Sequence, residues 1–254
     1  MPFVALFLGY EAVRGIAPKS GIPVHYRYVI RVDRALSGGT DPSRWLQAHL
    51  GSVRWLAIAC TVVYFCHFLV PVAVGMLLWL VDRVQFLRFT VALLGMCFAA
   101  FVVFLLVPVA PPWLASEHHL LPGVRSLIAL PSAVSPFYRS LDPDVAAAFP
   151  SLHAAFPLLA ALALWPVSRR AAAAALAWSA VVWFSVVYLG QHYVADVIGG
   201  VAFAAGTWLV MTQVLVPMVP SLRHQAAVSE QRSTDPGTAR PDPAPESATR
   251  LGSS

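Results

Sequence analysis

The chain has 254 residues, of which 58% are hydrophobic and only 11% are charged, and its formal net charge is +5. Soluble domains carry about twice that charged fraction, so the composition excludes an ordinary soluble domain built around one core. Several apolar runs approach the roughly 20 residues that a membrane-spanning helix needs. We therefore predict an all-α, polytopic membrane helix bundle with about five to six transmembrane helices. The bilayer is its expected partner, and no nucleic-acid partner is expected.

Residues 1–54 combine a short N-terminal hydrophobic segment with a polar, interfacial region. The opening run, MPFVALFLGYEAVRGIAP, is short for a span and lacks the basic residues and cleavage site of a signal peptide, so we expect a short first span. Residues 15–54 carry six basic residues and too few apolar residues to cross the bilayer. We expect an amphipathic helix at the membrane interface over residues 41–56, with Asp41 as its N-terminal cap.

The predicted transmembrane catalytic bundle covers residues 55–218. Its first span, residues 55–81, is 27 residues long and contains Pro71, which we expect to kink it. Residues 111–149 are expected to form a long irregular loop, because repeated prolines oppose a further long helix. From residue 219 the chain is rich in Ser, Pro and Ala, which predicts a disordered tail over residues 219–254. The remaining spans are expected at residues 89–109, 151–165, 171–189 and 194–216.

Arginines set the expected orientation of these spans. The break at residues 82–88 and the break at residues 166–170 each contain two arginines, and the positive-inside rule places both in the cytoplasm. The turn at residues 190–193 then faces the outside of a bacterial cell membrane, while the C-terminal tail is cytoplasmic. The basic residues of segment 15–54 would also lie outside. Either the topology is inverted, or those arginines have another task, such as holding anionic lipid.

Two histidines stand at helix ends that the order of the spans brings to one membrane face. His153 opens the third of these spans in AFPSLHAAF, and His192 follows the fourth in GQHY. Because these two spans are antiparallel neighbours, both imidazoles reach the same surface. Asp196 lies four residues after His192, about one helical turn away, so its carboxylate can accept the proton of one imidazole nitrogen and fix the tautomer.

This set of side chains suits phosphoryl transfer through a covalent phosphohistidine. His192 would attack phosphorus and His153 would protonate the departing oxygen, so that no metal or other cofactor is needed. Ser151 is a good N-cap, and the free N–H groups at that helix start can hold an anion. Other interpretations stay open: a single histidine can be a surface or capping residue, and the His192–Asp196 pair can be structural or ligate a metal.

Two motifs give the chain a family resemblance. PSLH at residues 150–153 resembles the second signature of the type 2 phosphatidic acid phosphatase superfamily, and SVVYLGQHYVAD at residues 185–196 resembles the third. VAPPWLA at residues 109–115 and YFCHF at residues 64–68 make the chain similar to the branch related to inositol phosphorylceramide synthase. The resemblance covers roughly residues 50–210. It implies an integral membrane enzyme that acts on a lipid phosphate or phospholipid, either as a phosphatase or as a phosphotransferase with an alcohol such as inositol as acceptor.

The resemblance also implies roles for individual residues. His192 is the implied nucleophile, Asp196 its partner, His153 the general acid and Ser151 a phosphate contact, and we add Tyr193 as a substrate-binding residue.

The chain departs from the family pattern in its cations. Val186 stands where the third signature has arginine, and the first signature has no match. A phosphate group needs positive partners, and we look first to Arg139 and then to Arg125. The other candidates are Arg27, Arg31, Arg34 and Arg54. A site with so few cations favours a phosphodiester, with one charge, over a monoester.

The lost arginines also favour a rival from another class, a non-catalytic lipid-binding or transport protein that keeps the fold. That rival predicts that the imidazoles of His153 and His192 face different sides. A second rival, a metal-dependent membrane hydrolase, predicts inhibition by chelators. His67 falls within a span and is expected to hydrogen-bond inside the bundle, and Trp113 is expected to be an interfacial anchor.

Overall fold

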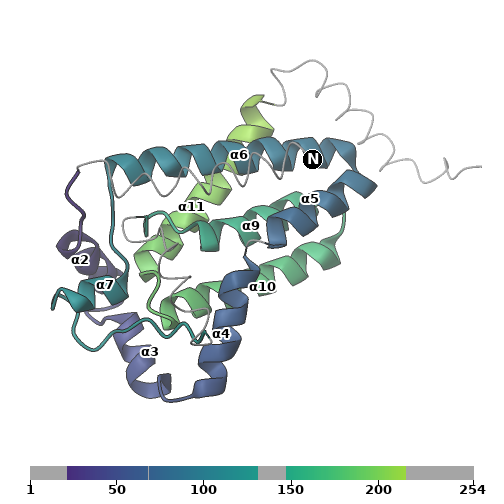
Figure 1. Ribbon diagram of the computed structural model, residues 1–254. Helices are drawn as coiled ribbons and strands as arrows, with labels where there is room; N and C mark the ends of the chain where they lie inside the picture. The colour runs from purple at the N-terminus through teal and green to yellow at the C-terminus, as the bar shows by residue number, and fades with distance from the viewer. Residues whose placement is uncertain (1–21, 68, 131–146, 216–254) are drawn as a thin grey trace, which may run out of the picture.

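A computed structural model describes residues 22–67, 69–130 and 147–215 (Figure 1). Outside these residues lie the N-terminal hydrophobic segment, the tail at 219–254, Arg139 and residues 131–146 of the predicted loop. The described residues confirm an all-α fold, with no strand among them and two isolated β-bridges, His25 to Val109 and Val109 to Ala147. The helices are α2 (Arg27–Leu36), α3 (Pro42–Leu50), α4 (Arg54–Cys66), α5 (Leu69–Val81), α6 (Arg83–Leu106), α7 (Pro112–Glu117), α9 (Leu152–Leu164), α10 (Arg169–Tyr188) and α11 (Val194–Val210), followed by a π-helical turn at Met211–Leu215.

The interfacial region differs from its prediction. Helix α3 begins after Asp41 but ends at Leu50, so residues 41–56 form parts of two helices rather than one. Asp41 occupies the N-cap position without capping α3. Its carboxylate instead accepts two hydrogen bonds from the Arg34 guanidinium, at 2.6 and 2.9 Å. A bidentate arginine is a stronger partner than a single backbone N–H group, which explains the exchange.

Three helices among the described residues are long and apolar enough to cross a membrane: α6, α10 and α11 with its extension to Val214. Helices α4 and α5 form a possible fourth span that is bent by 47°. The bend lies one turn before Pro71, because Pro71 has no N–H to donate to the His67 carbonyl and its ring crowds that group. Helix α6 starts six residues earlier than expected, since the Asp82 carboxylate accepts the N–H groups of Val84 and Gln85 and caps it.

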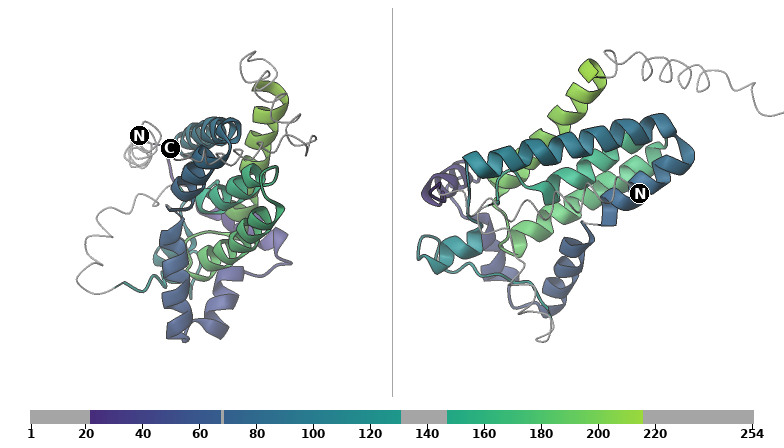
Figure 2. Two further views of the ribbon diagram at one scale, coloured as in Figure 1. Left: turned by 90° about the vertical axis from the view of Figure 1, so that its right-hand side faces the viewer. Right: turned by 45° about the horizontal axis from the view of Figure 1, so that its top comes forward.

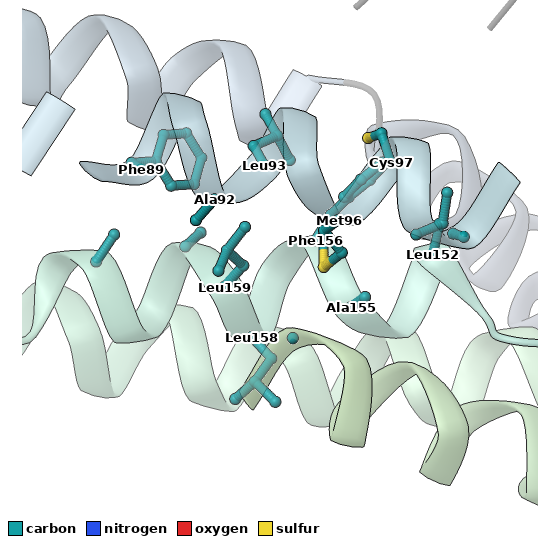
Figure 3. Close-up of a cluster of buried hydrophobic side chains, with 14 of the residues drawn as sticks. Phe89, Ala92, Leu93, Met96, Cys97, Leu152, Ala155, Phe156, Leu158 and Leu159 are labelled. Carbon is teal, nitrogen blue, oxygen red and sulfur yellow. The ribbon is translucent and has the colours of Figure 1, made fainter. Parts of the chain in front are cut away.

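Helix α9, expected as the third span of the bundle, has 13 residues and is about 20 Å long, which is shorter than the hydrocarbon core of about 30 Å. Twelve of those residues are buried. It packs against α5, α6, α10 and α11, so it is the centre of the bundle rather than a helix on its lipid face. Figure 3 shows Phe89, Leu93 and Met96 of α6 facing the α9 side chains.

One end of the bundle collects the beginnings and ends of several helices. Helices α2, α3 and α7 gather there, at the left of Figure 1, and the second panel of Figure 2 shows the same grouping from another side. Helix α2 packs against α11, and α3 packs against α10. Both predicted histidines lie at this end, because α9 and α11 start there and α10 finishes there.

Candidate active site

The turn between α10 and α11 places His192. Gly190 has φ +75°, the left-handed conformation that commonly ends a helix and that glycine adopts without strain. The N–H groups of Gln191 and His192 then donate to the Val186 carbonyl at 3.0 and 3.2 Å. A Cβ atom at Gly190 would lie 2.8 Å from the Arg125 carbonyl oxygen. The turn therefore depends on glycine both for its conformation and for its close packing.

The start of α9 places His153. Ser151 is the N-cap, as the sequence predicts, and its hydroxyl accepts the Ala154 N–H at 3.3 Å. Its own N–H donates to the Asp196 carbonyl at 3.0 Å, which ties the start of α9 to the start of α11. Gly200 permits this approach, because a Cβ atom there would clash with the Ser151 carbonyl oxygen. Two backbone contacts thus hold the helices that carry the histidines in fixed register.

The two imidazoles meet directly. His153 Nδ1 lies 3.1 Å from His192 Nε2, and both side chains are about 98–99% buried. His192 Nδ1 lies 3.0 Å from the Ala148 carbonyl oxygen, which can only accept, so this nitrogen carries the proton. When both rings are neutral, the Nε2 lone pair of His192 accepts the hydrogen bond that His153 Nδ1 donates.

Asp196 lies beside His192, but its hydrogen bonding differs from the prediction. Its Oδ2 atom accepts the Tyr193 N–H at 2.9 Å and lies 3.6 Å from His192 Nδ1. The imidazole proton goes to Ala148 instead. The reason is local: Asp196 is the third residue of α11, where a carboxylate turns back to the free N–H groups of its own helix. It remains close enough to form an ion pair with a protonated His192.

The VAPPWLA stretch supports this corner through its backbone. The Ala148 N–H donates to the Val109 carbonyl at 3.0 Å, which helps to position the residue whose carbonyl accepts the His192 proton. The Trp113 N–H donates to the Gly190 carbonyl at 3.1 Å. The sequence predicts Trp113 as an interfacial anchor, and the structure adds this contact with the turn that precedes His192. The stretch therefore contacts Ala148 and Gly190, two residues that position His192.

A third histidine lies against His153. His67 Nδ1 donates to the Tyr64 carbonyl at 2.7 Å, which confirms the predicted hydrogen bond inside the bundle. Its ring centroid is 3.8 Å from that of His153, and the Tyr64 ring stacks on His153 at 4.4 Å. Sequence reasoning missed this contact. The YFCHF motif gave a signal, because residues three apart share a helix face, but it did not identify the partner across the bundle.

The remaining predicted residues have different surroundings. Tyr193 is 1% exposed, and its hydroxyl has no hydrogen-bond partner among the residues that the structure describes. Val186 is fully buried in an apolar cluster, so no cation replaces the family arginine at that position. Arg34 is paired with Asp41. Arg125 is exposed, and the neighbouring Ser126 accepts a hydrogen bond from Gln191, which directly precedes His192.

A separate groove of about 530 Å³ lies between α6 and α11. Small residues line it, including Gly95, Ala99 and Gly206, and none of the predicted site residues does. The predicted site residues therefore lie outside this groove. We place the candidate site at the histidines because two ionisable rings buried in contact need a reason that packing alone does not supply.

Comparison with known proteins gives one family match and two similar relatives. A family model described as the PAP2 superfamily matches residues 27–210. A phosphoinositol dihydroceramide synthase of Bacteroides thetaiotaomicron is 25% identical over 235 residues, which cover 82% of this chain and 74% of that protein. An inositol phosphorylceramide synthase of Candida albicans is 30% identical over 104 residues, which are 37% of this chain and 22% of that protein. No solved structure gives a significant match.

Proposed function

Since this chain belongs to the PAP2 superfamily, in the branch related to inositol phosphorylceramide synthase, we propose that His192 carries a phosphoryl group from one lipid oxygen to another. The family and the apolar helices make the protein an integral membrane enzyme that handles lipid phosphates. The contact of 3.1 Å between His153 Nδ1 and His192 Nε2 is the observation that carries the proposal. A non-catalytic bundle has no need to bury two imidazoles against each other.

The first half-reaction uses both rings. The Nε2 lone pair of His192 forms a bond to phosphorus, and the bond from phosphorus to the leaving oxygen breaks. His153 enters this step as an imidazolium, with protons on both ring nitrogens. Its Nδ1 proton passes to that oxygen, which leaves as an alcohol, and His153 becomes neutral. In the second half-reaction an acceptor hydroxyl gives its proton back to His153 and attacks phosphorus, and the phosphorus–nitrogen bond breaks. Atoms and charges balance over the two steps.

Positive charge builds up on His192 as it attacks, and its surroundings favour that charge. The Ala148 carbonyl holds the Nδ1 proton at 3.0 Å, and the Asp196 carboxylate lies 3.6 Å from the same nitrogen. A carbonyl dipole and a carboxylate, both fixed before the reaction, stabilise the transition state without reorganising during it. Asp196 thus acts as an electrostatic partner of His192, and Ala148 fixes its tautomer.

In-line transfer puts the attacking nitrogen and the leaving oxygen on opposite sides of phosphorus. Two nitrogens 3.1 Å apart leave no room for a phosphorus atom between them, so the rings have to separate when substrate binds. The Tyr64 and His67 rings pack against the His153 ring, and such ring contacts permit the imidazole to shift. His192 is held more firmly, by Ala148 and by the adjoining turn. We therefore assign the movement to His153.

The substrate class follows from the charges near the site. With Val186 in place of arginine, a phosphodiester with one negative charge suits the site better than a monoester with nearly two. Arg125 is our candidate cation among the described residues, and Arg139 remains a proposal outside them. Both relatives carry names of synthases. We infer that the enzyme transfers a phosphoinositol-type headgroup from a phospholipid to a ceramide-type alcohol, with Ser151 and Tyr193 contacting the substrate.

The side of the membrane is also a proposal. The two-arginine breaks support a site that faces outside a bacterial cell membrane and a cytoplasmic tail. A cysteine introduced at exposed Ser52, near the site end, is expected to react with an impermeant thiol reagent applied to intact cells, in a background without native cysteines. Labelling only after permeabilisation would invert the topology.

The test of function combines a substrate panel with trapping of the intermediate. Purified protein is incubated with labelled phospholipids and lipid phosphates, with and without a ceramide, and both free phosphate and transferred product are measured. We expect transfer, together with acid-labile label on the wild-type protein and none on His192→Ala. The matched control is His49→Ala, because His49 is exposed on α3. Normal turnover by His192→Ala would overturn the mechanism.

A further inference from the structure

The start of α11 needs partners for its backbone. The first N–H groups of any helix have no acceptor within the helix, and Ser, Thr, Asp or Asn at the N-cap commonly supplies one. Tyr193 occupies the N-cap of α11 and makes no such bond with its side chain in the first turn. The Asp196 carboxylate turns back to the Tyr193 N–H at 2.9 Å. A second acceptor is needed for the N–H groups of the turn that follows His192 directly.

Asp33 supplies that acceptor from a helix 162 residues away in sequence. Its Oδ1 atom accepts the Ala195 N–H at 2.9 Å, and the side chain is only 3% exposed. Helix α2 presents it, with Val29 and Ile30 buried in one apolar cluster with Tyr193 and Ala195. Because packing fixes α2 against α11, the carboxylate is a fixed cap rather than a chance surface contact.

We propose that Asp33 is a positioning residue of the reaction, which caps α11 from outside and so holds the backbone of His192 and Asp196 in place. The proposal rests on the proposed function of that site. The Asp33 carboxylate accepts the Ala195 N–H, and Ala195 directly precedes Asp196. The Asp196 carbonyl in turn accepts the Ser151 N–H at the start of α9, so α2 is connected to both helix starts. Loss of the cap frays the turn on which the distance from Asp196 to His192 depends.

A carboxylate is not required for this task, since any acceptor oxygen at the same place can receive the Ala195 N–H. Asp33→Asn keeps such an oxygen in nearly the same shape, and Asp33→Ala removes it. The matched control is Asp41→Asn, the same chemical change in a carboxylate that binds the Arg34 side chain. Comparing these three variants separates the loss of the cap from the loss of a negative charge.

The experiment uses the full chain in detergent or nanodiscs and two readouts. The first is kcat and KM for headgroup transfer. We expect Asp33→Ala to lower kcat about 10- to 100-fold with KM changed less than about threefold, and Asp33→Asn to recover most of kcat. The second is amide hydrogen exchange in peptides covering residues 190–200, where Asp33→Ala is expected to exchange faster than wild type, and Asp33→Asn and Asp41→Asn are not.

The two readouts keep the proposals apart. Unchanged exchange in Asp33→Ala would show that Asp33 does not cap α11, and faster exchange with normal kcat would show that the cap does not serve catalysis. If Asp33→Ala does not fold, Asp33→Asn decides: activity near wild type supports the proposal, and a loss of kcat as large as expected for the alanine variant contradicts it. If wild type acts on none of the lipids, the proposed function fails, and hydrogen exchange still judges the cap.

Discussion

The two helices that carry the histidine site begin in different ways. Helix α9 begins with Ser151, whose own hydroxyl accepts an N–H group in the first turn. Helix α11 begins with Tyr193 and depends on two carboxylates, one of them Asp33 from a distant helix. The first turn of α9 is thus capped by its own N-cap residue, whereas the first turn of α11 uses a carboxylate from a distant helix as well as its own Asp196. The comparison teaches that helix capping beside His192, the proposed nucleophile, depends on a tertiary contact, while helix capping beside His153, the proposed acid, is local.

The largest expected effect tests the α9 side of the comparison. His153→Ala removes the proposed proton donor and should lower kcat about 10²- to 10⁴-fold for a natural lipid alcohol as leaving group. A substrate with an acidic phenol as leaving group needs no proton, so its kcat should fall much less. The measurement is the ratio of the two rates in both proteins. An equal loss on both substrates would argue against the acid role.

The second largest expected effect concerns the contact between the start of α9 and helix α11. Gly200→Ala places a methyl group against the Ser151 carbonyl and should destabilise the protein by about 1–3 kcal/mol, with a clear loss of activity. Gly206→Ala, on the same helix, meets nothing within 4 Å and should be neutral. Thermal unfolding in detergent measures both. Similar stability of the two variants would show that α9 and α11 do not approach as closely as described.

The local cap of α9 gives a smaller effect. Ser151→Ala should cost about 1 kcal/mol of stability through loss of the cap. Ser168→Ala removes the corresponding hydroxyl at the start of α10, far from the site, and should cost about the same. Only Ser151→Ala should also raise KM or lower kcat, because Ser151 is a proposed phosphate contact. If the two variants have equal kinetics, Ser151 serves the helix alone.

The smallest expected effect concerns the pH dependence of the distant cap. Burial raises the pKa of Asp33 to about 6, although its hydrogen bond from Ala195 lowers it. Asp196, Tyr193 and Asp41 are the other titratable groups near it. A raised pKa means that the folded protein binds the proton more tightly than the unfolded chain does. Its stability should therefore fall as pH rises from about 4 to about 6, relative to Asp33→Asn.

Unfolding temperatures of wild type and Asp33→Asn over this pH range measure the difference, which we expect to reach a few degrees, with the variant the more stable at the upper end. A wild-type protein that gains stability over the same range, relative to the variant, would contradict the burial of Asp33. Asp41→Asn serves again as the comparison.

Sequence reasoning worked where the signal was local or followed from the order of the helices. The Ser151 cap and the bend near Pro71 follow from local sequence. The convergence of His153 with His192 follows from the order of the helices, because two antiparallel helices return the chain to the same end of the bundle. The predicted start of α6 is wrong by six residues, because the prediction took no account of Asp82 as an N-cap.

The remaining features depend on contacts that no local pattern encodes. The Ala148 carbonyl is an unremarked backbone group until the fold brings it to His192. In the sequence, Asp33 is one acidic residue among the arginines of α2, and no local pattern predicts its contact with α11. Only the folded structure shows that its carboxylate accepts the Ala195 N–H. The apolar residues of α9 predict a membrane span. Burial among other helices and burial in lipid favour the same apolar residues, so composition does not distinguish the two. The four helices packed around α9 show that it is buried inside the bundle.

The hydrogen bond between the histidines has a consequence for selectivity. A lone pair that is already shared with a neighbouring N–H is a poor nucleophile toward any electrophile that happens to arrive. In the proposed mechanism His153 therefore shields His192 from side reactions as well as serving as proton donor, and only a molecule that separates the two rings exposes the attacking nitrogen. Recognition and activation become a single event, so a lipid that binds without parting them occupies the protein as an inhibitor.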